Sequence, residues 1–153
     1  MHSDRPDESD LQAPWLASLP LEPGYQEAAL VVVHHGRAAA PAEGLAQVLR
    51  FHADGQGGWI AAARSAQGRW GYVDGDGRWR VPPILQRAFS FSSDGLARFC
   101  QDGRWGFLDL AGRVAIAPTY DNAQPFRHGV CAVQVGKDVW RIIGRDGNAR
   151  CSE

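Results

Sequence analysis

The chain has 153 residues, of which 44% are hydrophobic and 22% charged, with 16 Lys and Arg against 17 Asp and Glu. A chain of this length can bury a core without a metal or a disulfide, and its net charge of −1 excludes a strongly basic nucleic-acid binder. Eighteen glycines and six tryptophans beside a single methionine predict packed sheets joined by tight turns, not a helical bundle.

The N-terminal third predicts a tail followed by a cap. Residues 1–10 are acidic and polar, which is typical of a disordered tail and not of a signal peptide. No apolar run approaches the ~20 residues that a membrane helix needs, so we expect a cytoplasmic protein without membrane contact. Residues 11–57 are expected to cap the array that follows.

Three local patterns define this expected cap. Residues 14–21 are apolar but interrupted by prolines, and they predict a strap laid across the core. Residues 29–35 predict a strand. Apolar side chains at helical spacing over residues 42–52 predict a short amphipathic helix.

The rest of the chain, residues 58–153, is dominated by an internal repeat. Trp70, Trp105 and Trp140 are separated by intervals of 35 residues, and a glycine follows each of them seven residues later. Around each tryptophan, apolar runs alternate with Gly-containing turns, which is the pattern of antiparallel hairpins. We therefore predict three three-stranded meanders, over residues 59–65, 70–74 and 78–81, then 96–101, 105–109 and 113–116, then 130–135, 140–143 and 148–151.

The alternation within each middle strand indicates how the three units stack. Trp70 and Tyr72 share one face of a strand, as do Trp105 and Phe107. With Trp140, these rings are the predicted anchors that bury one unit against the next, because a single meander cannot bury an aromatic face by itself. The glycine after the tryptophan leaves room for a close approach on the other face.

These motifs resemble those of the WG-repeat (KWG-repeat) proteins, which are widespread in bacteria. The matching stretches are Arg69-Trp70-Gly71-Tyr72-Val73-Asp74, Arg104-Trp105-Gly106-Phe107-Leu108-Asp109, Gly95-Leu96-Ala97, Tyr120-Asp121, Pro118 and Phe126. The third unit departs from the pattern, with Arg141 in place of the glycine and Gly144 in place of the aspartate. The resemblance implies a stacked β-repeat fold and a partner-recognition role, such as that of an immunity protein that neutralises a toxin.

A recurring set of basic side chains forms the candidate binding face. Its members stand at matching positions of the repeat and include one tryptophan expected to be exposed: Arg69, Arg78, Trp79, Arg80, Arg104 and Arg113. Arginine and tryptophan are favoured anchors at interfaces, so this face fits another protein with an acidic surface. Single-stranded nucleic acid or another polyanion is an alternative partner. The competing structural interpretation is that the arginine stems cover sheet edges while their charges pair with aspartates.

Catalytic and metal-binding interpretations rest on fewer residues. His34 and His35 are adjacent on a predicted strand and so face opposite sides, which disfavours chelation of one ion. Cys100 or Cys131 with His128 could supply a nucleophile and a base for a small hydrolase, but buried thiols are inert. Asp74 and Asp109 could act as acids and bases, although an aspartate entering a turn more often accepts backbone N–H bonds. We expect no enzyme activity, no metal and no cofactor.

Overall fold

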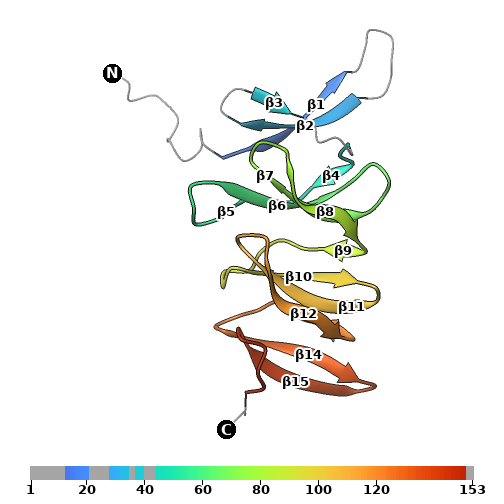
Figure 1. The fold of residues 1–153 in the computed structure, drawn as a ribbon, viewed down its shortest axis with the longest axis vertical. Coiled ribbons are helices and arrows are strands. Elements are labelled where there is room, and N and C mark those ends of the chain that lie inside the picture. The colour runs from blue at the N-terminus through green and yellow to red at the C-terminus, as the bar shows by residue number, and fades with distance from the viewer. Residues whose placement is uncertain (1–12, 21–27, 35–36, 40–43, 151–153) are drawn as a thin grey trace.

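The structure is a computed structural model that describes residues 13–20, 28–34, 37–39 and 44–150. Within these ranges it consists of antiparallel strands joined by turns, without a helix. The sheets follow one another along the long axis of the molecule, from the N-terminal to the C-terminal end (Figure 1). The prediction of a mainly β repeat fold is confirmed, while the predicted disordered tail, residues 1–10, lies outside the described residues.

The first sheet contains β1 (Trp15–Pro20), β2 (Ala28–His34) and β3 (Arg37–Ala39) in that order. The prediction of a proline-interrupted strap over residues 14–21 is wrong for residues 15–20, because β1 pairs antiparallel with β2 along its whole length. Pro14 precedes β1 and Pro20 is its last residue, so the prolines flank this ladder and do not interrupt it.

The helix predicted over residues 42–52 is not formed in the described residues 44–52. Short strands β4 (Gln47–Val48) and β5 (His52–Ala53) instead pair with the first repeat strand. Between them, the backbone N–H of Leu49 donates to Ala62 O at 2.8 Å. Helical propensity is a weak preference, and here pairing with a neighbouring strand outweighs it.

Two complete repeat sheets follow. The first contains β6 (Trp59–Arg64), β7 (Trp70–Asp74) and β8 (Trp79–Leu85), and the second contains β9 (Arg87–Ala88), β10 (Leu96–Gln101), β11 (Arg104–Asp109) and β12 (Val114–Tyr120). Their orders are β4-β6-β7-β8 and β12-β11-β10-β9, so the predicted meanders are present in both. Strands β8 and β12 extend four residues beyond their predicted ends and include Pro82, Pro83 and Pro118. These prolines are tolerated because both strands lie at sheet edges.

The glycine of each Trp-Gly pair makes room for the third strand. A Cβ built on Gly71 would lie 2.3 Å from Val81 O, and one on Gly106 would lie 2.5 Å from Ile116 O. The pairing register between the second and third strands shifts at these same positions. A side chain at either glycine would therefore collide with backbone.

The third unit has no complete third strand within the described residues, and the replacement of this glycine explains why. Its sheet contains β13 (Asn122–Ala123), β14 (Val130–Gly136) and β15 (Val139–Gly144). The third strand predicted over residues 148–151 is reduced, within the described residues, to one isolated bridge between Ile143 and Ala149. Arg141 stands where the other units have glycine, so its Cβ occupies the space that a crossing strand requires.

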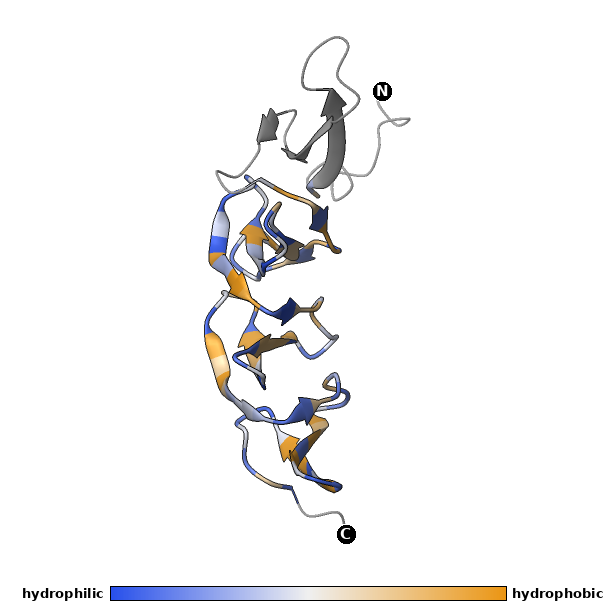
Figure 2. Ribbon diagram, turned by 90° about the vertical axis from the view of Figure 1, so that its right-hand side faces the viewer, coloured by the Kyte–Doolittle hydropathy of each residue, from blue (hydrophilic) through white to orange (hydrophobic). Residues whose placement is uncertain are grey.

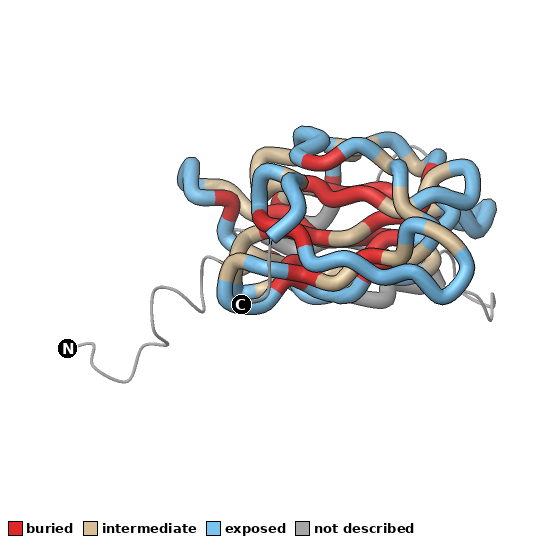
Figure 3. The backbone as a smooth tube through the Cα atoms, turned by 90° about the horizontal axis from the view of Figure 1, so that it is seen from below, coloured by how far each residue is buried: buried red, intermediate tan, exposed pale blue. Residues whose placement is uncertain are grey.

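Two apolar layers lie between consecutive units. Tyr72 and half-buried Trp70 of the first unit pack against the next sheet, and Phe107 and half-buried Trp105 do the same one unit later. Tyr72 and Phe107 are fully buried. Figure 2 shows the repeat sheets one after another along the long axis, and in the end-on view of Figure 3 the exposed residues form the rim.

The tryptophan face of each unit points toward the C-terminal end of the array, which decides the environment of Trp140. No further described sheet covers the last unit, so Trp140 is 45% exposed and Ile142, at the position of Phe107, is 38% exposed. The prediction of three buried indole anchors is therefore wrong for Trp140, and Trp70 and Trp105 are half-buried.

Candidate functional site

The predicted basic face is divided between two opposite edges of the array. Arg69 and Arg104 stand where β7 and β11 begin, and Arg78 and Arg113 stand beyond the turns that follow these strands. A strand of this length is roughly 15 Å long, so the two pairs do not form one patch. Arg87 of β9 is the cross-strand partner of Cys100, which is itself paired with Trp105, so it lies at the same edge as Arg104. We call Arg69, Arg87 and Arg104 the basic edge, and Arg78, Arg80 and Arg113 the turn edge.

Trp79 does not belong to an exposed face. Its ring packs against Ala61, Ala63 and Val73 on the side of the first repeat sheet that faces the cap. Its indole nitrogen is buried and has no hydrogen-bond partner among the described residues. The expectation of an exposed aromatic at this position is wrong, because β8 directs this side chain toward Leu45, Val48 and Phe51.

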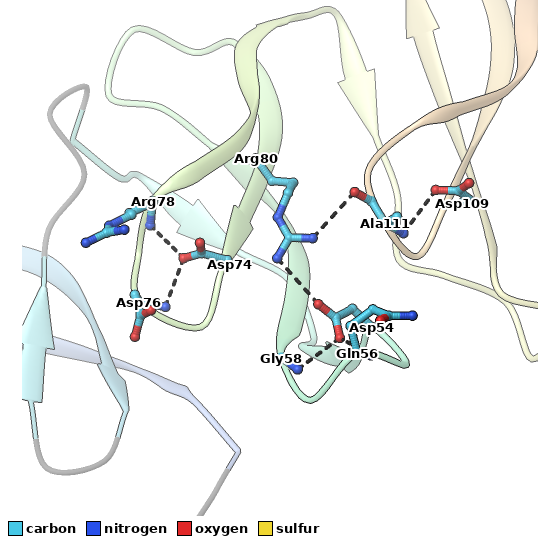
Figure 4. Close-up of polar contacts among 9 residues, drawn as sticks. All are labelled: Asp54, Gln56, Gly58, Asp74, Asp76, Arg78, Arg80, Asp109 and Ala111. Atoms are coloured by element: carbon cyan, nitrogen blue, oxygen red, sulfur yellow. Dashed lines mark hydrogen bonds and ion pairs between the residues drawn. The ribbon is translucent and has the colours of Figure 1, made fainter.

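On the turn edge, Arg80 connects two units. Its Nη2 lies 3.4 Å from Asp54 Oδ2, and its Nη1 donates to Ala111 O of the next unit at 3.4 Å (Figure 4). Burial opposes ionisation of Asp54, but the backbone N–H groups of Gln56 and Gly58 and the Arg80 guanidinium outweigh it and lower the pKa of this carboxyl. For Arg80, the interpretation that the charge pairs with an aspartate is confirmed.

Arg104 is also paired, through its Nη1 and Asp121 Oδ1 at 2.7 Å, although both side chains are exposed. Arg69, Arg78 and Arg113 are exposed, and none of them forms a salt bridge within the described part of the chain. The recurrent arginines therefore divide into two whose charges are paired with a carboxylate and three whose charges face solvent.

The repeated aspartates close turns. Asp74 Oδ1 accepts the backbone N–H groups of Asp76 and Arg78, each at 2.9 Å (Figure 4). Asp109 Oδ1 accepts those of Ala111 and Arg113, each at 3.0 Å. Each carboxylate thus satisfies two donors of the hairpin turn that it precedes.

Cys131 and His128 are not arranged as a nucleophile and a base. Cys131 is buried, donates to Gln124 O at 3.1 Å, and has its pKa raised to about 11 by burial. His128 is exposed in a turn with φ of +53°. Among the described residues no three metal-ligating side chains gather, and no helix has the length and apolarity that crossing a bilayer requires. His34 ends β2, while its neighbour His35 lies outside the described residues.

An open groove runs beside the basic edge, from the cap past the connector between the first two units to Pro125 before the third. Its first half, about 370 Å³, has walls from the cap, from the Trp-Gly strand and from the connector to the second unit: Gln47, Leu49, Trp70, Gln86, Arg87, Ala88 and Phe89. Trp70 and Phe89 are half-buried, so each presents part of its ring to this hollow. Because Arg64 is the cross-strand partner of Trp70, its side chain lies on the same face beside the indole.

The second half of the groove, about 310 Å³, shares Leu49 and Phe89 with the first. It is completed by Ser90, Phe91, Ser92, Leu96, Arg98 and Pro125. The Arg98 guanidinium lies 4.3 Å from the centre of the Phe89 ring, which itself stacks on Trp105 at 5.8 Å. No carboxylate lines either half, and the two arginines that line it are Arg87 and Arg98.

The sequence analysis did not identify this groove. Leu49, Trp70, Phe89 and Arg98 come from four separate segments, and only Trp70 carried a repeat signal. Arg98 is paired across the sheet with Phe107, whereas Tyr72, at the corresponding position of the first unit, is paired with Ala62. An arginine in a position otherwise occupied by alanine was the one available hint.

Stacked antiparallel sheets, each with a Trp-Gly pair at the start of its middle strand, define a β-repeat module. The family model of the WG containing repeat matches two adjacent repeats, residues 70–105 and 105–137. The matched residues end before Trp140, in the unit where Arg141 replaces the glycine. No curated protein and no solved structure matches the chain.

Proposed function

We propose that this chain is a non-catalytic module that binds another protein, and that its partner presents an acidic surface to the basic edge. The observation that carries this proposal is the charge of that edge. Arg69 and Arg87 are exposed and form no salt bridge with the described residues. Arg87 lines a groove that contains the partly exposed rings of Trp70 and Phe89, and Arg69 immediately precedes Trp70.

Arginine beside an aromatic, partly apolar hollow is the composition of energetically important interface centres. The opposite edge differs in charge, because Asp54, Asp74 and Asp76 lie close to Arg78 and Arg80 there. On the basic edge, Asp121 pairs with Arg104 and Asp102 stands two residues before it, which leaves Arg69 and Arg87 without a carboxylate partner among the described residues. An acidic partner would therefore be attracted to the basic edge more strongly than to the turn edge. Arginines arranged in this way are also compatible with a polyanion, but the net charge of −1 favours a protein.

The test is capture of a partner from a lysate of the source cells by two matched double variants. Arg69→Glu with Arg87→Glu reverses two charges on the basic edge, and Arg78→Glu with Arg113→Glu reverses two on the turn edge. All four side chains are exposed, so both proteins are expected to fold, which circular dichroism checks.

We expect wild type and the turn-edge variant to retain the same stoichiometric protein, and the basic-edge variant to lose it. Retention should also weaken at high salt, because the Debye length falls from about 10 Å at 0.1 M to about 3 Å at 1 M. Equal capture by both variants would exclude the basic edge as the binding surface. A toxin as the captured protein would support the immunity role that the family resemblance implies.

A further inference from the structure

We infer that the groove that runs from the cap along residues 86–92 to Pro125 is a site for an extended acidic segment of the partner, with a carboxylate on Arg98 and an apolar side chain between Leu49 and Trp70. This inference rests on the proposed protein-binding function and adds to it the chemistry of the bound segment. It is carried by the state of Arg98, a residue outside the recurrent arginine set.

Arg98 is a half-buried cation without an anion. Its Nη1 donates to Ala123 O at 2.7 Å, and its guanidinium lies over Phe89 and within 5.8 Å of the centre of Trp105. Within the described part of the chain no carboxylate forms a salt bridge with it. The Cys131 thiol, which is close enough to affect its charge, is neutral at pH 7 because its pKa is raised to about 11.

Partial burial of a guanidinium costs free energy that a paired carboxylate would offset. Burial lowers the pKa of Arg98, in keeping with this cost. Only one of the five N–H donors of the side chain has a partner in the described residues. Arg98 lines the second half of the groove, and a carboxylate is the group that a guanidinium binds in a bidentate manner.

The shape of the groove favours an extended ligand. Its two halves share Leu49 and Phe89 as walls, and both are lined by residues of the connector from Gln86 to Ser92. Seven residues of extended chain span roughly 20 Å. Each half is near the lower limit of ~300 Å³ for ligand pockets, so it can take a few side chains but not a helix about 10 Å wide. The aromatic and aliphatic walls of the first half fit an apolar side chain next to the acidic one.

The experiment measures how two peptide probes bind to wild type and to variants. The probes are fluorescein-labelled octapeptides, one alternating leucine with glutamate and the other alternating leucine with glutamine, and binding is followed by fluorescence anisotropy. In wild type, we expect the glutamate probe to bind at least about tenfold more tightly, as for a hydrogen bond to a charged group. In Arg98→Met, which keeps an apolar stem but removes the charge, this preference should disappear.

The comparison of probes separates recognition from packing. If Arg98 only supported the fold, Arg98→Met would weaken both probes equally and leave their ratio unchanged. Arg113→Met is the matched control, since Arg113 is exposed, lies on the opposite turn edge and is absent from the groove lining, and its probe preference should equal that of wild type. Heteronuclear NMR gives a second readout, because the Nε–H signal of Arg98 should shift saturably with the glutamate probe alone.

Two results would overturn this inference: no saturable binding of the glutamate probe at millimolar concentration, or a preference for glutamate that survives Arg98→Met. Failure here is distinguishable from failure of the proposed function. If Arg98→Met still captures the partner that the basic-edge variant loses, the module binds a protein elsewhere along that edge. If the probe binds but no lysate protein is captured, the groove assignment stands without the wider proposal.

Discussion

Replacing the glycine of a Trp-Gly pair by alanine tests the packing of the whole repeat. A Cβ at Gly106 would lie 2.5 Å from Ile116 O, 2.7 Å from Pro118 N and 2.9 Å from Ala117 C. All three atoms are backbone, so no side chain can rotate away. Restoring an ordinary contact of about 3.5 Å requires β12 to move by about 1 Å.

That movement gives the expected magnitude. Overpacking a core by one carbon costs ~1–3 kcal/mol, and β12 carries Ile116, which is only 7% exposed in the layer between the last two units. We therefore expect Gly106→Ala to lower the free energy of unfolding by about 3 kcal/mol, near the top of that range. With typical slopes for urea unfolding, the midpoint should fall by roughly 1–2 M.

The matched control is Gly103→Ala in the preceding hairpin turn. It adds the same methyl group, but nothing lies within 4 Å of the new Cβ and only the positive φ of +80° opposes it. This substitution should cost about 1 kcal/mol. Urea titrations followed by tryptophan fluorescence and circular dichroism compare the two. If Gly106→Ala were no more destabilising than Gly103→Ala, the glycine of the Trp-Gly pair would not be required for the close approach of β12.

The same contacts lead to three further predictions. Trp105→Ala should cost about 3 kcal/mol because its ring is half-buried and stacked on Phe89, whereas exposed Trp140→Ala should cost less than about 1 kcal/mol; equal urea midpoints would contradict this. Because the folded pKa of Asp54 is lowered, the stability that wild type has over Asp54→Asn should be complete above pH ~4 and decline as the pH falls through the lowered value; a constant difference in melts from pH 7 to 2 would refute it. Cys131 should resist iodoacetamide at pH 8 until urea unfolds the chain, since its pKa is about 11, and rapid labelling of the native protein, read by mass spectrometry, would show that it is accessible.

Local chemistry determined the units of this protein. The hairpin turns follow from glycines such as Gly77 and Gly112, whose positive φ other residues rarely adopt, and from the aspartates that precede them. The sequence also predicted the buried Tyr72 and Phe107, because strand alternation fixes which side chains share a face. These signals act over a few residues, and their recurrence at intervals of 35 residues made them visible in the sequence.

Pairing with a strand outside the cap decided the secondary structure of the cap. Residues 44–52 have a pattern that fits one face of a helix, yet two short strands form there because the edge of β6 is available to them. A local pattern cannot show that such an edge exists. The length of β8 and β12 was missed for a related reason, since prolines end a central strand but are tolerated at an edge.

The sequence determined what each repeat unit is, and the tertiary structure decided what surrounds it. The tryptophan of the repeat is half-buried at position 105 and exposed at position 140. The reason is that the third unit packs on the face that carries Trp105, whereas no described sheet packs on the face that carries Trp140. The recurrent arginines looked like one face in the sequence, but a strand carries its two ends to opposite edges. The groove with Arg98 arises only where the cap, the first unit and the connectors meet, and contacts between such distant segments leave no periodic signal.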